Sequence, residues 1–147
     1  ASYQGGKWLG SVAALYWTGA RPSELEETRF IYGRHAVARI EGGKLRGRAN
    51  RTLPLMPAAV AWLKKAGKPT KVAPISREVR RPICKLAGVK WKADIPRHTY
   101  ITNRLLLIDS DALVAREAGT SETVIHRSYR NPDVTRADAK RWEKSRP

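Results

Sequence analysis

The sequence predicts a mainly helical fold with one small antiparallel β-sheet, of the α+β class. Apolar residues recur at helical spacing along most of the chain. Short runs typical of strands occur only in one stretch near the front, between residues 30 and 55. The length of 147 residues fits a single domain that is large enough to bury a core.

Two helices are expected before the sheet. The first spans residues 7–16, whose apolar side chains fall on one helical face, and Thr18-Gly19-Ala20 ends it. Pro22 suits the first turn of a second, short helix that runs to about residue 28. Arg21 therefore stands at a helix start behind a tight glycine turn, where an anion can bind, although a solvated surface arginine also fits this spacing.

Three short strands are expected next, over residues 30–32, 36–40 and 51–55. The hairpin between the last two strands carries the densest positive charge of the chain, on Lys44, Arg46, Arg48 and Arg51. A cationic hairpin can enter a groove of DNA, and the same composition also fits a solvated loop.

The rest of the chain is predicted to be helical. Candidate caps and glycine stops divide it into helices over residues 57–66, 76–87, 97–108, 111–118, 121–127 and 135–144. The segment 97–108 is the most apolar of these, so we expect it to be the central buried helix.

The charge of the chain points to a polyanionic partner. With 29 basic and 13 acidic residues, the net charge is +16 and the pI is near 10.7. Nucleic acid is the first expectation and an anionic membrane surface the second. Because 41% of the residues are hydrophobic, a disordered basic arm is excluded.

Metal and membrane sites are not expected. Cys84 is the only cysteine, which excludes an intrachain disulfide and a multi-thiolate zinc site. His35, His98 and His126 have no metal-ligand spacing. No apolar run reaches the length of a membrane span and the start is not a signal peptide, so an intracellular protein is expected.

Three motifs lie in order along the chain. They are Thr18-Gly19-Ala20-Arg21-Pro22-Ser23-Glu24-Leu25, then Pro96-Arg97-His98-Thr99-Tyr100, then Ala118-Gly119-Thr120-Ser121 followed by Tyr129. The basic hairpin, which Arg51-Thr52-Leu53-Pro54-Leu55 closes, lies between the first two. In this order and spacing the motifs resemble the boxes and the lysine-bearing hairpin of the tyrosine recombinase (phage integrase) catalytic domain, from about residue 8 to the end.

The resemblance implies a fold like that catalytic domain, and DNA cleavage and rejoining in site-specific recombination or integration by a mobile element. Tyr129 would attack a DNA phosphate and form a 3′-phosphotyrosyl link. A 5′-hydroxyl can reverse this step, so no cofactor is implied. Arg21 and Arg97 would clamp the nonbridging oxygens through planar, always protonated guanidinium groups. Glu24, one turn after Arg21, would orient it, although a helix-surface glutamate fits the spacing nearly as well.

In the family a hairpin lysine protonates the departing 5′-oxygen. Lys44 is the only lysine on this hairpin, whereas counting back from Pro54 places the family's position closer to Arg46. Arginine is a poor acid, so the resemblance favours Lys44 as the acid. DNA contacts are expected from Lys44, Arg46, Arg48 and Arg51.

Two positions depart from the family pattern. Asp94 stands where the family usually has His or Lys, and Thr120 where it usually has His or Trp. Asp94 can act as a base toward the Tyr129 hydroxyl, but its charge also repels the phosphate. Thr120 can donate a hydrogen bond to a phosphate oxygen, yet it cannot act as an acid or a base at neutral pH. His98 is expected to be structural, beneath the site, and His126 to lie at the surface.

The expected organisation is a disordered stretch over residues 1–6 and one catalytic domain over residues 7–147. The N-terminal DNA-binding domain of the family has no counterpart in this sequence, and the start at Ala1 suggests an excised or processed chain. The resemblance implies double-stranded DNA as partner, a monomer alone and a homotetramer on paired DNA sites. It also implies a cytoplasmic, nucleoid-associated protein of prokaryotic or phage type.

Two other functions remain open at this point. The departures at Asp94 and Thr120 favour a decayed recombinase domain that acts as a non-enzymatic DNA-binding module. A basic RNA-binding protein would explain the charge, but not the ordered motifs.

Overall fold

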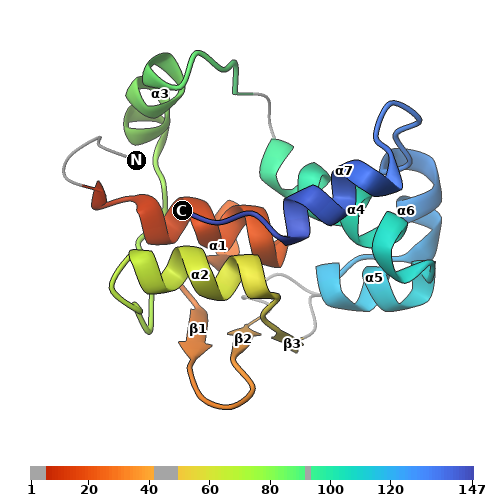
Figure 1. The fold of residues 1–147 in the computed structure, drawn as a ribbon, viewed down its shortest axis with the longest axis horizontal. Coiled ribbons are helices and arrows are strands. Elements are labelled where there is room, and N and C mark those ends of the chain that lie inside the picture. Colours follow the sequence, from red (N-terminus) through yellow and green to blue (C-terminus); the bar gives the residue numbers. More distant parts are fainter. Residues whose placement is uncertain (1–5, 42–49, 92–93) are drawn as a thin grey trace.

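A computed structural model of the chain describes residues 6–41, 50–91 and 94–147 (Figure 1). The predicted α+β class is confirmed, since these residues form seven α-helices, a 3-10 helix and a small antiparallel sheet. The elements are α1 (Leu9–Thr18), the 3-10 helix η2 (Pro22–Glu24), β1 (Thr28–Ile31), β2 (Val37–Ile40), β3 (Arg51–Pro54), α2 (Pro57–Lys65), α3 (Arg77–Leu86), α4 (Ile95–Ile108), α5 (Asp111–Ala118), α6 (Glu122–Ser128) and α7 (Arg136–Glu143).

The sheet is an antiparallel meander in the order β1-β2-β3. Side chains alternate between its two faces, so two rows across the strands face the core. One row is Phe30, Ala38 and Leu53, and the other is Thr28, Ile40 and Arg51. An arginine therefore ends a row of core-facing residues.

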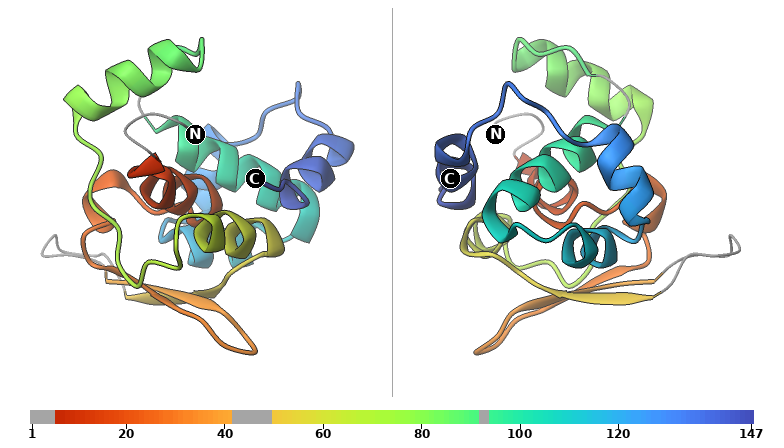
Figure 2. Two further views of the ribbon diagram at one scale, coloured as in Figure 1. Left: turned by 60° about the vertical axis from the view of Figure 1, so that its left-hand side comes forward. Right: turned by 90° about the vertical axis from the view of Figure 1, so that its right-hand side faces the viewer.

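The helices cover one side of this sheet, with α1 in the middle of the molecule (Figures 1 and 2). Helix α1 packs against both α2 and α4, and α7 packs against α4. Trp17 stacks between Trp62 and Trp142, at ring-centroid distances of 5.7 and 6.4 Å. These contacts hold α7 on its own chain.

Local side-chain chemistry sets the helix starts, as predicted. The Ser76, Ser110, Ser121 and Thr135 hydroxyl oxygens each accept a hydrogen bond from the backbone N–H three residues later. Gly19 and Gly119 end α1 and α5 in the left-handed conformation.

Two predictions about the helices need correction. The short helix expected to reach residue 28 is a single 3-10 turn, because Thr28 already pairs with Ile40 in the sheet. The buried residues of helix α4 all lie between positions 96 and 103, whereas its apolar C-terminal residues 105–108 are only half-buried. The neighbouring elements, and not apolarity alone, determine which part of α4 forms the core.

Helix α3 lies at the periphery, apart from the helices around α4 (Figures 1 and 2). Only Cys84 of this helix is buried. Of residues 1–6, expected to be disordered, only Gly6 is among those described. No helix within the described ranges is long and apolar enough to cross a membrane.

Candidate active site

The turn after α1 is held rigidly in place. The Thr18 hydroxyl donates to the Ala14 carbonyl at 2.7 Å, and the Ala20 N–H donates to the Thr18 oxygen at 3.2 Å. Gly19 has a φ of +63°, and a Cβ there would lie 2.4 Å from Cδ1 of Tyr100. Only glycine fits this position. The turn directs the Gly19 carbonyl toward α4, where it accepts a hydrogen bond from Arg97.

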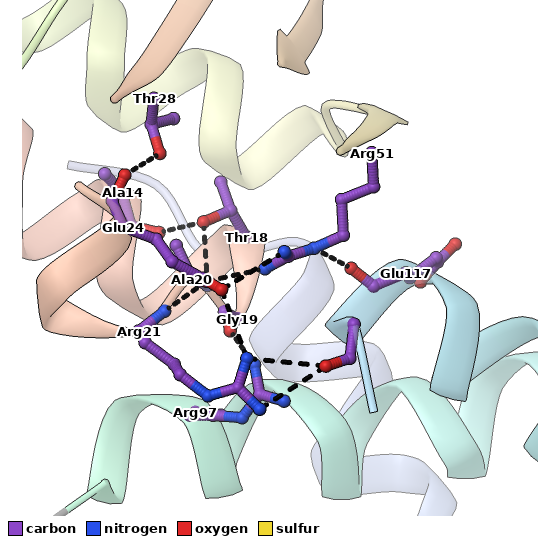
Figure 3. Close-up of polar contacts among 11 residues, drawn as sticks. Ala14, Thr18, Gly19, Ala20, Arg21, Glu24, Thr28, Arg51, Arg97 and Glu117 are labelled. Carbon is purple, nitrogen blue, oxygen red and sulfur yellow. Dashed lines mark hydrogen bonds and ion pairs between the residues drawn. The ribbon is translucent and has the colours of Figure 1, made fainter. Parts of the chain in front are cut away.

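Arg97 is a buried cation beside that turn. It is 3% exposed, and its Nη1 donates to the Gly19 carbonyl at 2.6 Å (Figure 3). Its Nη2 is buried, and none of the described residues is a hydrogen-bond partner for it. Burial and then the charge of Arg21 lower the pKa of Arg97, while the nearby Tyr129 hydroxyl opposes this shift. Arg97 therefore lies next to both Arg21 and Tyr129, and its Nη2 donor can bind an anion.

Arg21 comes to the same place from the start of η2. Its guanidinium lies beside that of Arg97 (Figure 3) and donates to the Gly119 carbonyl at 3.3 and 3.4 Å. Its Nη1 also lies 3.1 Å from Oε1 of Glu24. The Arg21 side chain is 27% exposed, so the buried Arg97 and the partly open Arg21 form a two-arginine cradle.

Glu24 lies behind the cradle and binds two arginines. Its carboxylate accepts from the Arg21 backbone N–H at 2.9 Å and from Nη2 of Arg51 at 2.8 Å. Burial raises the pKa of this carboxyl, but the hydrogen bonds from Arg51 and Arg21 and their charges outweigh burial, so its pKa lies below the ordinary value. The surface alternative for Glu24 is thus wrong, since the residue is 2% exposed.

Tyr129 follows α6 and is fixed from two sides. The Thr102 hydroxyl of α4 donates to the Tyr129 carbonyl at 2.9 Å. On the other side, Asp111 of α5 pairs with His126 and Arg130, at 2.8 and 2.9 Å. The half-buried Tyr129 ring therefore keeps its place beside Arg97 although it lies in a connecting segment.

The contact between the His98 and Tyr129 rings was not predicted from the sequence. His98 was expected to be structural and to lie beneath the site, but it is exposed, with its ring 4.4 Å from that of Tyr129. Because His98 directly follows Arg97 in the second motif, the sequence did indicate that His98 lies near the site. The face of α4 on which it lies depends on packing and could not be read from the motif. His126 is at the surface, as predicted.

The two residues that depart from the family pattern lie at the ends of different helices, Asp94 just before α4 and Thr120 just after α5. Asp94 is exposed and left-handed just before α4, and its carbonyl accepts the His98 N–H at 2.8 Å. Thr120 is half-buried beside Gly119, and lines a cavity of about 430 Å³ together with Arg51. Neither side chain has a described hydrogen bond to Tyr129.

The hairpin predictions divide into two groups. Lys44, Arg46 and Arg48 lie outside the described residues, so the choice between Lys44 and Arg46 as the acid stays a prediction. Arg51 was expected to contact DNA, but its side chain is 7% exposed and its guanidinium binds Glu24 and the Glu117 carbonyl. Its donors face the protein interior because β3 places it on the core side of the sheet.

No group of three histidine, cysteine, aspartate or glutamate side chains within the described ranges could hold a metal ion. A scan against protein-family models finds no match for this chain. Searches of the curated proteins and of the solved structures find none either.

Proposed function

We propose that this chain is a tyrosine recombinase catalytic domain, which breaks and rejoins DNA through a 3′-phosphotyrosyl link to Tyr129. The observation that carries the proposal is the buried Arg97, whose Nη2 has no hydrogen-bond partner among the described residues and which lies beside both Arg21 and the Tyr129 hydroxyl. A buried cationic donor without a partner is costly, and an oxygen of a DNA phosphate would satisfy it.

The proposed reaction uses the cradle to hold the phosphate. Arg21 and Arg97 bind the nonbridging oxygens, on which charge increases in the transition state. Oη of Tyr129 attacks phosphorus, and the bond from phosphorus to the 5′-oxygen breaks. The phenolic proton passes to a base, and the departing oxygen takes a proton from an acid. The 5′-hydroxyl can later attack the phosphotyrosine and reverse each step.

The base and the acid are proposed to be Asp94 and Lys44. Asp94 is linked to Tyr129 through His98, whose backbone N–H donates to the Asp94 carbonyl at 2.8 Å and whose ring lies 4.4 Å from the Tyr129 ring. Thr120 is proposed to donate one hydrogen bond to the phosphate, from its place beside the Gly119 carbonyl that binds Arg21.

The charge distribution supports DNA as the polyanion. Away from the cradle, α3 and the segment after it surround a cavity of about 820 Å³ with basic side chains, those of Arg77, Arg80, Arg81, Lys85 and Lys90. The net charge of +16 is thus spread over more than one surface. A duplex is long enough to contact several such surfaces at once, with affinity supplied by its phosphates.

One observation favours the alternative, a DNA-binding module without catalysis. Asp94 brings a negative charge to the site, and Thr120 cannot act as an acid or a base at neutral pH. Loss of a single acid–base group typically slows a reaction by about 10²–10⁴-fold. A module of this kind would retain DNA binding and form no covalent intermediate.

The test uses a random-sequence duplex pool, end-labelled and nicked just 3′ of the cleavable phosphate, so that the product diffuses away and the attack is trapped. We expect a denaturant-stable protein–DNA adduct with the wild type and none with Tyr129→Phe. Tyr32→Phe is the matched control, because it removes a hydroxyl whose one described hydrogen bond is to the Pro69 carbonyl. An adduct that persists in Tyr129→Phe would show that Tyr129 is not the nucleophile. Salt-dependent binding without any adduct would favour the module.

A further inference from the structure

Arg51 is a buried arginine whose position follows from the register of the sheet. It pairs with Ile40, which in turn pairs with Thr28, and all three face the core. A guanidinium at the end of a core-facing row needs hydrogen-bond partners, because it cannot lose its charge. Its side chain is 7% exposed, so these partners come from the protein.

The guanidinium of Arg51 makes contacts in two directions. Toward Glu24 it makes a two-point contact, with Nη2 at 2.8 Å from Oε2 and Nη1 at 3.4 Å from Oε1. Toward α5, its Nε donates to the Glu117 carbonyl at 2.8 Å. Arg51 thus joins β3 to η2, at Glu24, and to the end of α5, at Glu117 (Figure 3).

Both of these contacts lead to Arg21. The Glu24 carboxylate that Arg51 binds also accepts from the Arg21 backbone and from its Nη1, at 2.9 and 3.1 Å. Gly119 lies two residues after Glu117, and its carbonyl accepts hydrogen bonds from both Nη atoms of Arg21. The same Gly119 lies so close to Arg51 that a Cβ there would be 2.9 Å from its Nη1.

Without Arg51, the two supports of Arg21 would change together. Glu24, 1% exposed at its side chain, would keep Arg21 as its only described cationic partner and would draw that guanidinium toward itself. The end of α5 would lose its link to β3, and with it the fixed position of the Gly119 carbonyl. Lysine could not replace Arg51, because one ammonium cannot reproduce the planar fork.

We infer that Arg51 is a positioning residue, which acts through Glu24 and Gly119 to hold the Arg21 guanidinium in place for a phosphate. The inference rests on the proposed function for the role of the phosphate. The placement of Arg21 by Arg51 is a separate statement, which can be measured without any reaction.

The kinetic test is a double-mutant cycle on the single-turnover rate of adduct formation at saturating DNA. Arg51→Lys is expected to lower this rate by about 10–100-fold in the wild-type background and by less than about twofold in Arg21→Ala, with DNA affinity changed by less than about threefold. Equal losses in both backgrounds would overturn the inference, because Arg51 would then support the fold in general. Arg104→Lys is the matched control, since Arg104 is also partly buried and makes a two-point ion pair, to Glu117.

A second measurement separates this inference from the proposed function. The Nε–H resonance of Arg21, observed by NMR in arginine-labelled protein, is expected to shift and broaden in Arg51→Lys and to stay unchanged in Arg104→Lys. An unchanged resonance in Arg51→Lys would overturn the inference whether or not an adduct forms. If Arg51→Lys fails to fold, Arg51→Gln removes the same two-point contact without changing Glu24 or Arg21, and the same shift and broadening of the Arg21 resonance are expected and decisive.

Discussion

Arg97 is a buried cation whose hydrogen bonds are incomplete. Burying a charge is expensive unless it is paired, and described contacts give Arg97 the Gly19 carbonyl for Nη1 and no partner for Nη2. A purely structural arginine would be expected to have a carboxylate, as Arg51 and Arg104 have. The arrangement at Arg97 instead suits an anion that arrives from outside.

Replacing Arg97 tests this reading of the cradle. In Arg97→Lys the charge remains but the planar fork is lost, so the rate of adduct formation should fall by about 10²–10³-fold. DNA affinity, measured by fluorescence anisotropy, should change by less than about threefold, because one of several phosphate contacts is altered. Arg141→Lys, at an exposed arginine of α7, is the control. An equal loss of rate in both variants would contradict the cradle.

The low pKa of Glu24 predicts a dependence of stability on pH. A carboxyl whose pKa falls on folding stabilises the protein above its unfolded pKa of 4.5, and this contribution is lost as the pH falls through the lower folded pKa. In urea unfolding, the free energy of unfolding of the wild type should therefore fall between about pH 5 and pH 3 more steeply than that of Glu24→Gln. Glu26→Gln, at an exposed position, is the matched control. Parallel curves for the wild type and Glu24→Gln would refute this account.

At the scale of the elements, the site depends on where helices end. The turn after α1 supplies the Gly19 carbonyl and Arg21, the end of α5 supplies the Gly119 carbonyl, and the end of α6 supplies Tyr129. Helix α4 runs past all three ends and contributes Arg97. The geometry of the cradle is therefore set by termini that pack against one helix.

Gly19 tests this dependence on a helix end. Gly19→Ala would add a methyl group 2.4 Å from the Tyr100 ring at a φ of +63°, so we expect a loss of roughly 2–4 kcal/mol in the free energy of unfolding. Gly67→Ala is the control, because Gly67 has a φ of +86° but no atom near the added Cβ, and it should lose only about 1–2 kcal/mol. Urea unfolding of both variants measures the difference. Equal losses would show that the contact with Tyr100 is unimportant.

Local chemistry made much of the fold predictable. The caps at Ser76 and Thr135 were predicted because a hydroxyl and a backbone N–H three residues later suffice to start a helix. The length of η2 was not predicted, because pairing of Thr28 with Ile40 depends on a strand distant in sequence.

The site was predictable only in part. The motifs identified Arg21, Arg97 and Tyr129, which the structure brings together. The burial of Arg51 was missed because the hairpin was read as a run of charges. Alternation from the core residue Leu53 would have placed Arg51 on the inner face of β3. The contact between His98 and Tyr129 depends on how α4 is turned against α6, which no local pattern encodes.

The whole molecule combines a high positive charge with a C-terminal helix that packs on its own chain. Trp142 of α7 stacks on Trp17 and meets the edge of Tyr100, so its apolar face is covered. The basic side chains around α3 lie on a peripheral helix, away from this packing. The molecule thus combines a cationic surface around a peripheral helix with a core that α7 covers.

The charge predicts how DNA binding responds to salt. If about six phosphates are neutralised, log K should fall with log salt concentration with a slope of roughly −5. Titrations of a labelled duplex at several salt concentrations, read by fluorescence anisotropy, measure this slope. A flat dependence would rule out binding through the phosphates.

The cis packing of α7 predicts the oligomeric state. Because α7 covers α4 of the same chain, the protein should be a monomer in the absence of DNA. Light scattering over a wide range of protein concentrations measures the mass. A dimer at every concentration would contradict the closed placement of α7.

The most direct test of the central claim is to locate the covalent bond. Protein trapped on a duplex with a bridging phosphorothiolate at the cleavable position can be digested, and the peptide that carries the nucleotide identified by mass spectrometry. We expect a 3′-phosphonucleotide on Oη of Tyr129, which is lost in Tyr129→Phe and retained in Tyr32→Phe. A nucleotide on another residue, or no adduct while salt-dependent binding persists, would contradict this claim.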